Sequence, residues 1–396
     1  MKLATSIMKR RNDLERLRRE MISETQDEFF TEKQFLALVL LYEYAFGCGL
    51  KKSHRLKKLL LKHKKILTSK IDPLVAEMKR SGELDEDATK MCKVPRYVRI
   101  NTLKTSTDEV LKTLLTDGWL KLSTGNLLTQ EQYMQKVRSL VNCEFLVDKH
   151  IPSILTFPPG TELHKNELVV AGKLILQDKS SCFPPMLLRA RPGAKVLDIC
   201  AAPGLKTSQI AAQMQNKGII SVDLNEERVA TMKNLLNLYG IECCEVLCSD
   251  FLALDMASDQ FSDVTHALVD PPCSGSGIYS RNEAYADRQS SMTPMRLDRL
   301  GNLQAMILKR ALSICTLQRL VYSTCSTFER ENEAVVQEVL DEYSDYYHLE
   351  YAFPQWTHRG MESYSFGKCC LRFSEEDLTN GFFIAVFVSN EVTNDI

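Results

Sequence analysis

The sequence predicts an α/β fold built on a mainly parallel sheet, preceded by a small α+β module and an N-terminal helical domain. From about residue 173 to 389, short apolar runs alternate with segments of helical periodicity, as strands and crossover helices do in such a sheet. Residues 92–170 alternate over shorter lengths, which indicates the separate α+β module. Residues 1–88 have few turn signals and read as helices.

The α/β domain, predicted over residues 171–392, begins with an apolar strand at 195–199 and a helix at 205–214 behind it. The later elements are predicted as strands at 219–224, 244–248, 266–270, 320–325 and 381–388, with helices at 226–238 and 296–315. The acidic stretch at 81–87 reads as a linker before the α+β module.

Composition limits the kind of protein this is. The chain of 396 residues is 44% hydrophobic, enough for a large core. Its longest strongly apolar stretch near the N-terminus, 35–42, is far shorter than the ~20 residues that span a bilayer, so we expect no membrane segment. Thirteen cysteines, an odd number, indicate free thiols in a reducing compartment. Cys243, Cys244 and Cys248 lack a second cluster or a nearby histidine, so we predict no metal.

Charge is unevenly distributed, since residues 1–110 carry a net +8 and residues 111–396 a net −9. Residues 51–70 (KKSHRLKKLLLKHKKILTSK) hold nine Lys and Arg and no acid, with leucines and isoleucines at roughly helical spacing. That pattern predicts a basic amphipathic helix. A solvated helix face, a phosphate-contacting surface and a membrane or partner-helix surface all remain open as its role.

A nucleoside cofactor is indicated by residues 196–212 (VLDICAAPGLKTSQIAA), where a strand, a tight turn of small residues and a helix follow one another. Such a turn brings backbone N–H groups and a helix N-terminus close to a ligand. Asp223 closes the next strand, where a carboxylate can accept hydrogen bonds from both ribose hydroxyls. Asp250 and Asp270 end the third and fourth strands and complete a row of acids at the ligand-binding edge, although each also fits a simple strand-end cap.

Two familiar phosphate-binding motifs do not fit this turn. It reads C-A-A-P-G rather than G-x-G-x-x-G, so it lacks the glycines that a dinucleotide pyrophosphate needs. Gly204 and Lys206 lack the upstream glycine of a P-loop. NAD and nucleoside triphosphates are therefore disfavoured.

Two cysteines stand directly after predicted strands: Cys273 in DPPCSGSG (270–277) and Cys325 in YSTCS (322–326). A buried structural thiol is the usual role of an intracellular cysteine. Both of these, however, fall on turns that would line the cofactor crevice, where a partly exposed thiolate is chemically active.

With these motifs, the sequence from about residue 92 onward resembles the Sun-domain (NOL/NOP/Sun) RNA cytosine-C5 methyltransferases. The matching stretches are PRYVRINTLK (95–104), LQDKSS (176–181), CAAPGLKT (200–207), DPPCSGSG and YSTCS. The segments WTHRG (356–360) and GFFIAVF (381–387) look most like the subgroup acting on large-subunit ribosomal RNA. The resemblance implies a Rossmann-like domain that uses S-adenosylmethionine, an RNA substrate, and a nuclear, nucleolar location, with a mitochondrial one left open.

The resemblance also implies roles for particular residues. Cys325 is similar to the family's nucleophile, and Cys273 to the cysteine that helps to release product. The residues at the family's cofactor positions are Cys200, Ala201, Ala202, Pro203, Gly204, Leu205, Lys206, Asp223, Arg228, Asp250 and Asp270. Arg228, taken alone, also fits a solvated residue in the first turn of its helix.

The chemistry of carbon 5 supports this assignment. That carbon is too weak a nucleophile to take a methyl group directly, so a thiolate must first add to carbon 6, which splits one hard step into two. Lys206 is the candidate that favours the thiolate of Cys325. Asp270, if held protonated by a semi-buried setting, can donate a hydrogen bond to N3 of the pyrimidine. Cys273, or a water that it positions, is the expected base for the carbon 5 proton.

The target cytosine must be single-stranded or flipped out to meet a thiolate. The basic segment 51–70 and the α+β module are expected to supply compensating RNA contacts, with Arg96, Arg99 and Lys104 chosen as backbone contacts. Three alternatives remain open: a DNA cytosine methyltransferase, whose nucleophile lies in the PC motif; the same activity on another RNA such as tRNA; and a ribosome-assembly protein without activity.

Overall fold

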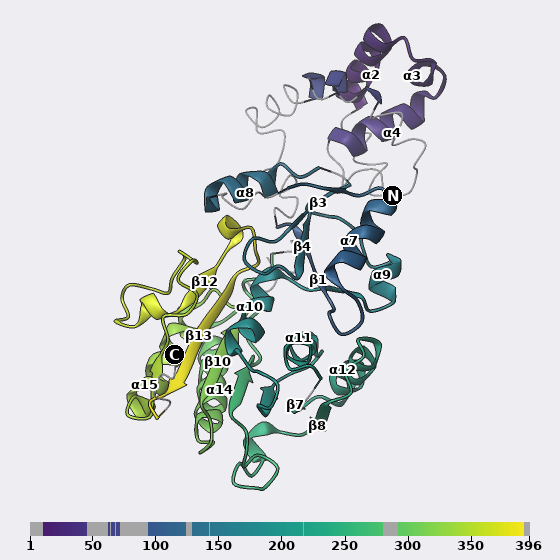
Figure 1. The fold of residues 1–396 in the computed structure, drawn as a ribbon. Helices are drawn as coiled ribbons and strands as arrows, with labels where there is room; N and C mark the ends of the chain where they lie inside the picture. Colours follow the sequence, from purple (N-terminus) through teal and green to yellow (C-terminus); the bar gives the residue numbers. More distant parts are fainter. Residues whose placement is uncertain are drawn as a thin grey trace. The chain divides into compact units, whose positions relative to one another are not determined.

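The structure, a computed structural model, describes residues 11–45, 62–63, 65–67, 69–71, 94–123, 129–141, 143–216, 218–279 and 292–391. The chain divides into two compact units, Met1–Met91 and Cys92–Ile396 (Figure 1). Most of the basic segment 51–70 and all of the acidic stretch 81–87 lie outside the described residues. The basic amphipathic helix and the linker therefore stay predictions.

The first unit is helical, as its periodicity predicted, with α2 (Arg11–Thr25), α3 (Glu28–Glu32) and α4 (Gln34–Ala45). Its core is formed by apolar side chains from all three helices together with Leu67 and Ile71. Asp27 caps α3 by accepting the N–H of Phe29 and also accepts a hydrogen bond from His63 Nε2 at 2.9 Å. One carboxylate thus joins the N-terminus of α3 to His63.

The second unit begins with a five-stranded sheet in the order β2-β3-β4-β1-β5. Apolar residues of β1, β4 and β5 pack against α7 and α9 in a core of their own. The elements are β1 (Arg96–Ile100), α7 (Thr107–Thr116), β2 (Leu120–Lys121), α8 (Gln130–Arg138), β3 (Glu144–Val147), β4 (Ile154–Phe157), α9 (Glu167–Val170) and β5 (Leu174–Leu176).

A larger eight-stranded sheet follows, in the order β11-β13-β10-β9-β6-β7-β8 with β12 paired to β13. Its strands are β6 (Val196–Ile199), β7 (Ile219–Asp223), β8 (Cys244–Cys248), β9 (His266–Val269), β10 (Arg319–Thr324), β11 (Tyr347–Leu349), β12 (Leu371–Phe373) and β13 (Phe382–Ser389). Its helices are α10 (Lys179–Leu188), α11 (Leu205–Gln213), α12 (Glu226–Leu238), α14 (Pro294–Leu312) and α15 (Glu333–Tyr343). The predicted strands and helices of this region are all present, with ends shifted by at most three residues.

The order of the strands fixes where a ligand can bind. Strands β8, β7, β6, β9 and β10 run parallel, and β6 lies between β7 and β9 because the chain crosses back after β8. At such a reversal the loops after the two central strands diverge and leave a crevice at the carboxyl ends. The crevice therefore lies beyond β6 and β9.

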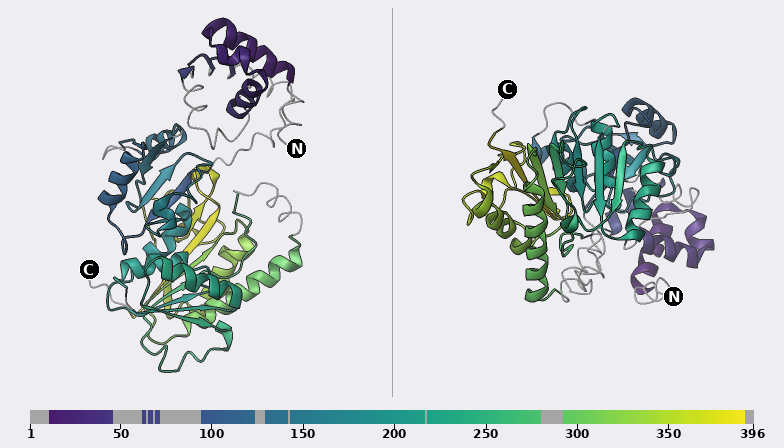
Figure 2. Two further views of the ribbon diagram at one scale, coloured as in Figure 1. Left: turned by 90° about the vertical axis from the view of Figure 1, so that its right-hand side faces the viewer. Right: turned by 90° about the horizontal axis from the view of Figure 1, so that it is seen from below.

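Alternate residues of the central strands face two separate cores. Helices α10, α11 and α12 cover one face, where Val196, Leu268 and Val321 are buried. Helices α14 and α15 cover the other, where Leu197 and Tyr322 are buried. Figure 1 and Figure 2 show helices on both faces of the sheet. This two-sided burial explains why the strands read as continuous apolar runs.

The structure corrects the prediction that Arg99 contacts RNA. Its side chain is only 1% exposed, and its guanidinium donates to Gln177 Oε1 (2.8 Å), Ser208 Oγ (2.6 Å) and the carbonyl of Leu205 (3.2 Å). Arg99 therefore joins β1 of the small sheet to α11 of the large one. Lys104 is exposed but donates to the carbonyls of Ala171 and Leu238. An RNA contact by Lys104, or by the exposed Arg96, stays a prediction.

A buried ion pair also joins the two sheets. Lys179, at the first position of α10, lies 2.7 Å from Asp148 in the loop after β3, and both side chains are almost fully buried. Asp148 also accepts the hydroxyl of Tyr133 from α8 at 2.8 Å, and Lys179 Nζ lies 2.9 Å from His150 Nδ1. Removing one partner of such a pair leaves an uncompensated charge in the interior.

We therefore expect Lys179→Met to lower the free energy of unfolding by about 3–5 kcal/mol, because Asp148 is left buried without the ammonium that offsets its loss of hydration. Lys173→Met is the matched control, since Lys173 pairs with Glu109 at 2.6 Å on the surface and should cost about 0–1 kcal/mol. Urea unfolding of both full-length variants measures the difference. Equal midpoints for the two variants would show that the buried pair adds nothing beyond a surface pair.

Candidate functional site

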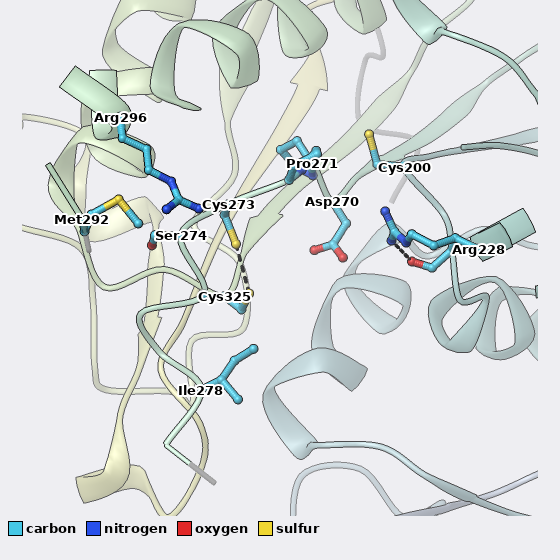
Figure 3. Close-up of a pocket in the computed structure, with 13 residues that line it drawn as sticks. Cys200, Arg228, Asp270, Pro271, Cys273, Ser274, Ile278, Met292, Arg296 and Cys325 are labelled. Carbon is cyan, nitrogen blue, oxygen red and sulfur yellow. Dashed lines mark hydrogen bonds between the residues drawn. The ribbon is translucent and has the colours of Figure 1, made fainter. Parts of the chain in front are cut away.

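A cavity of about 420 Å³ opens in the crevice beyond β6 and β9. It is lined by residues from three turns that are distant in sequence, among them Cys200, Ala202, Asp270, Cys273 and Cys325 (Figure 3). The strand-end motifs found in the sequence therefore meet in one place. This cavity is the candidate site.

The two predicted catalytic cysteines face each other. Cys273 Sγ and Cys325 Sγ lie 3.0 Å apart, as the dashed line in Figure 3 marks, and both are free thiols. Donation by the Cys273 thiol is the main cause that lowers the pKa of Cys325. Burial and then the charge of Asp270 oppose it, and the charge of Lys206 makes a smaller contribution that lowers the pKa. The same hydrogen bond, together with burial, raises the pKa of Cys273 well above its usual value. The pair thus favours a thiolate at Cys325 and a thiol at Cys273.

Cys200 is a third thiol of this cavity, and its environment is different. Burial raises the pKa of Cys200 to about 12, and the surrounding carboxylates of Asp223, Asp270 and Asp198 act in the same direction. Its sulfur therefore stays protonated near neutral pH. Of the three thiols, only Cys325 is in surroundings that suit a nucleophile.

Asp270 and Lys206 form an ion pair beside the cysteines. Lys206 Nζ lies 2.8 Å from Asp270 Oδ2, and the hydroxyl of Ser323 donates to Asp270 Oδ1 at 2.8 Å. Burial disfavours the Lys206 ammonium, but the attraction of Asp270 outweighs it, so the pKa of Lys206 is raised. Both oxygens of Asp270 thus act as acceptors, toward a cation and a hydroxyl, which differs from the expected role of Asp270 as a hydrogen-bond donor to N3.

The turn after β6 places its backbone as the sequence suggested. Cys200 and Gly204 have left-handed φ angles of 60° and 93°, and Gly204 is the N-cap of α11. A Cβ on Gly204 would lie 2.9 Å from Met232 Cγ, so only glycine fits between the turn and α12. The start of α11 is thereby held at the crevice, with its first N–H groups directed toward a ligand position.

Asp223 is the acid at the end of β7. Its side chain is only 4% exposed, and it accepts the N–H groups of Ala202 (3.1 Å) and Asn225 (3.2 Å). Arg228 NH1 lies 3.5 Å from the same carboxylate, and its other terminal nitrogen donates to the carbonyl of Ala202. Arg228 is therefore not simply a solvated helix residue, since it lines the cavity (Figure 3) and also bridges Asp223 to the turn.

The remaining predicted cofactor residues lie around this turn. Ala201 donates its N–H to the carbonyl of Val222 at 3.0 Å. The peptide bond between Ala202 and Pro203 is cis, and Leu205 is the first residue of α11. Asp250 is exposed and caps the short helix 251–253 at the end of β8, next to β7. Its side chain is thus at the predicted edge of the sheet, outside the cavity lining.

Two residues that sequence reasoning passed over belong to this site. Asp198 is completely buried in β6, where burial raises its pKa to about 7, and its Oδ2 accepts the hydroxyl of Thr207 at 2.6 Å. Among the described residues its Oδ1 has no hydrogen-bond partner. Arg296, in the first turn of α14, lines the cavity and extends toward the Cys273 loop (Figure 3). Asp198 was visible within VLDICAAPG, whereas no sequence signal marked Arg296.

Within the described ranges, no helix is both long and apolar enough to cross a membrane. Nor do these ranges contain a group of three or more His, Cys, Asp or Glu side chains placed to hold a metal ion.

Comparison with known proteins agrees with this geometry. Residues 185–388 match the family model of the 16S rRNA methyltransferase RsmB/F, and residues 94–177 match the ferredoxin-like domain of NOL1/NOP2/Sun domain family member 5. The chain is 42% identical over 362 residues to the 26S rRNA (cytosine-C(5))-methyltransferase nsun-5 of Caenorhabditis elegans, covering 89% of this chain and 81% of that one. It is 40% identical over 367 residues to the 28S rRNA (cytosine-C(5))-methyltransferase of Mus musculus, covering 90% and 77%.

Solved structures share the fold. A methyltransferase homolog protein from Pyrococcus horikoshii matches with a TM-score of 0.56 and 26% identity, covering 76% of this chain and 90% of that one. NSun6 from Pyrococcus horikoshii, crystallised with SFG, matches with a TM-score of 0.56 and 21% identity, covering 78% and 95%. The predicted fold, a Rossmann-like methyltransferase domain preceded by a small α+β module and N-terminal helices, is confirmed.

The thiol pair makes a prediction about reactivity. Because a lowered pKa leaves Cys325 ionised at lower pH, iodoacetamide should modify Cys325 at lower pH than Cys200, which lines the same cavity. Cys273→Ala removes the main cause of the lowered pKa, so the pH profile of Cys325 alkylation should move to higher pH. Peptide mass spectrometry after timed labelling reads both sites in one sample. A profile that stays in place or moves to lower pH in Cys273→Ala contradicts the assigned hydrogen bond.

Proposed function

Because the chain belongs to the NOL1/NOP2/Sun family of S-adenosylmethionine-dependent RNA (cytosine-C5) methyltransferases, we propose that it methylates a cytosine of large-subunit ribosomal RNA through a covalent bond to Cys325. The substrate is proposed from the relatives that are named for 26S and 28S ribosomal RNA. A nucleolar location accompanies such a substrate. The observation that carries the mechanism is the 3.0 Å thiol pair, in which one sulfur is favoured as thiolate and the other as thiol.

The reaction begins at Cys325. Its thiolate adds to carbon 6 of the cytosine, and the electron pair of the 5,6 double bond moves toward carbon 5 and N3. Lys206 stabilises the thiolate before the attack. With the base in the cavity, the Lys206 ammonium is the charged donor for N3 or O2, and the Asp270 carboxylate is the acceptor for the exocyclic amino group. This pairing distinguishes cytosine from uracil, which has no amino group to donate.

Cys273 acts after carbon 5 has gained its methyl group. The proton on carbon 5 must leave so that its electron pair can restore the double bond and expel Cys325 as a thiolate. Cys273, or a water molecule that it positions, takes this proton. Its sulfur lies beside Cys325, so it is within reach of the carbon next to the one that Cys325 attacks.

S-adenosylmethionine supplies the methyl group, as an electrophile bound to a sulfonium. The residues present fit such a cofactor: Asp223 offers a carboxylate for ribose hydroxyls, and the 200–205 turn offers backbone N–H groups. Arg228 and Asp250 complete the set that we assign to cofactor binding, beside Cys200 to Lys206.

RNA must reach the cavity from the side of the cysteines. Arg296 lines the cavity there, and no ion pair or side-chain hydrogen bond engages its guanidinium among the described residues. A guanidinium in this position suits a phosphate of the flipped nucleotide. The basic segment 51–70 remains a second proposed contact.

The central experiment separates the two cysteines. Incubated with cofactor and large-subunit ribosomal RNA from cells that lack the protein, Cys325→Ala should neither methylate nor form a covalent complex. Cys273→Ala keeps the nucleophile but cannot release it, so an RNA adduct should accumulate and migrate slowly on a denaturing gel. Bisulfite sequencing of RNA treated with the wild-type protein should show one newly protected cytosine.

Small-subunit ribosomal RNA and tRNA from the same cells are the matched substrate controls, and both should stay unmodified. Both variants should still bind S-adenosylmethionine, which controls for misfolding. An adduct from Cys325→Ala but none from Cys273→Ala reverses the roles of the cysteines and favours the arrangement of DNA enzymes. Methylation of tRNA alone overturns the proposed substrate.

Arg296→Ala should weaken RNA binding and flatten its dependence on salt by up to about 0.7 in the slope of log K against log salt, the value for one single-strand phosphate contact. Arg299→Ala is the matched control, because Arg299 is an exposed arginine of the same helix that does not line the cavity. Binding is measured in a Cys325→Ala background to prevent turnover. Identical slopes for the two variants exclude a phosphate contact by Arg296.

A further inference from the structure

Glu331 is a completely buried acid that bonds to both cysteine loops. It ends the short helix 329–331, six residues after Cys325. Its Oε1 accepts the N–H of Ser274 at 2.9 Å, and its Oε2 accepts the hydroxyl of Ser326. Ser274 directly follows Cys273, and Ser326 directly follows Cys325. One carboxylate therefore holds the residue next to each catalytic thiol.

A third donor strengthens this arrangement. Gln304 of α14 donates its amide to Glu331 Oε1 at 3.0 Å and to the carbonyl of Pro272 at 2.9 Å. The hydroxyl of Tyr322 donates to the backbone carbonyl of Glu331 at 2.6 Å, which fixes the acid itself. The Cys273 loop is thus held on both sides of the thiol, through Pro272 and Ser274.

The charge of Glu331 has no cation beside it, since no ion pair involves it in the described part of the chain. A buried carboxylate is costly unless hydrogen bonds replace its hydration. Here those bonds come from Ser274, Ser326 and Gln304. The Glu331 carboxylate therefore keeps all three hydrogen bonds only when both loops are in place. If either loop moved away, the carboxylate would lose a donor.

We propose that Glu331 is a positioning residue that keeps Cys273 against Cys325, and thereby makes product release possible. The inference rests on the proposed function, which gives the two thiols their separate roles. Without Glu331 the Ser274 N–H loses its acceptor and the Gln304 amide keeps only the Pro272 carbonyl. The two loops then stay joined through other contacts, such as the N–H of Gly277 to the Cys325 carbonyl, but the residue next to Cys273 is no longer held. Cys325 remains on the end of β10 and can still attack. The defect therefore falls on elimination.

Glu333 provides a matched control two residues away. It is equally buried, but its carboxylate binds the guanidinium of Arg372 and the N–H of Met361, so it bonds directly to neither cysteine loop. Its one link to the Cys325 loop is indirect, because Arg372 also donates to the carbonyl of Thr327 at 3.1 Å. A merely structural effect of removing a buried acid should appear in both variants. Trapping of an RNA adduct should appear only when Glu331 is changed.

The test uses the full chain, cofactor and the large-subunit ribosomal RNA described above. Glu331→Ala should reproduce Cys273→Ala: the Cys325-linked adduct accumulates, and its release slows by about tenfold to a hundredfold, the factor for one hydrogen bond to a charged group. Glu331→Gln keeps an acceptor for Ser274 and should trap less. Glu333→Gln should lose thermal stability without trapping an adduct. Glu331→Ala combined with Cys273→Ala should release no more slowly than Cys273→Ala alone.

The outcomes separate this inference from the proposed function. If Cys273→Ala traps no adduct, the assigned roles of the thiols fail. If Cys273→Ala traps an adduct and folded Glu331 variants do not, or if the double variant is slower still, the positioning role of Glu331 is overturned. Should Glu331→Ala fail to fold, Ser326→Ala removes only one of the three donors and must trap the adduct in its place. An adduct with Glu333→Gln equal to that with Glu331→Gln also overturns the inference.

Discussion

The parallel pairing of β9 with β10 positions the catalytic thiols, and the rest of the site is arranged around it. The register pairs His266 with Arg319 and Val269 with Tyr322, so β10 continues two residues past the end of β9. Cys273 and Cys325 follow within a few residues, which leaves their loops little freedom to separate. The loops are then joined by the N–H of Gly277, which donates to the carbonyl of Cys325 at 2.9 Å. A Cβ on Gly277 would lie 2.1 Å from the carbonyl oxygen of Gly381, so the close contact between Gly277 and Gly381 requires glycine at position 277.

The sequence was sufficient to predict the elements that make this edge of the sheet. Strands buried on both faces leave continuous apolar runs, and each run was followed by an acid or a cysteine at a predictable place, as with Asp223 and Cys325. The features that the sequence could not predict depend on hydrogen bonds between residues that are far apart in the chain. Arg99 has the sequence context of an exposed basic residue, yet its partner Ser208 is 109 residues away. The same distance effect hid Glu331, whose acceptor role depends on Ser274, 57 residues earlier.

Charges in the crevice are arranged so that each acid has a specific counterpart. Asp270 faces Lys206, Asp223 faces Arg228, and the buried Asp198 faces only the hydroxyl of Thr207. This leaves Lys206 to favour a negative sulfur at Cys325 while its pairing with Asp270 keeps the ammonium charged in a buried place. In a region of low dielectric, one unpaired charge would shift every neighbouring group.

The thiol pair also explains the order of the two proton-dependent steps. While Cys325 is a thiolate, its hydrogen bond is the main cause that raises the pKa of Cys273, and the charge of Glu331 acts in the same direction. Cys273 therefore keeps its proton and cannot act as a base. Once Cys325 is bonded to carbon 6, its sulfur is a neutral thioether and that cause disappears. Burial still raises the pKa of Cys273, but less is left to oppose its ionisation. In the proposed mechanism Cys273 then passes its proton to water and takes the one on carbon 5, so the contact that disfavours the base before attack is absent at elimination.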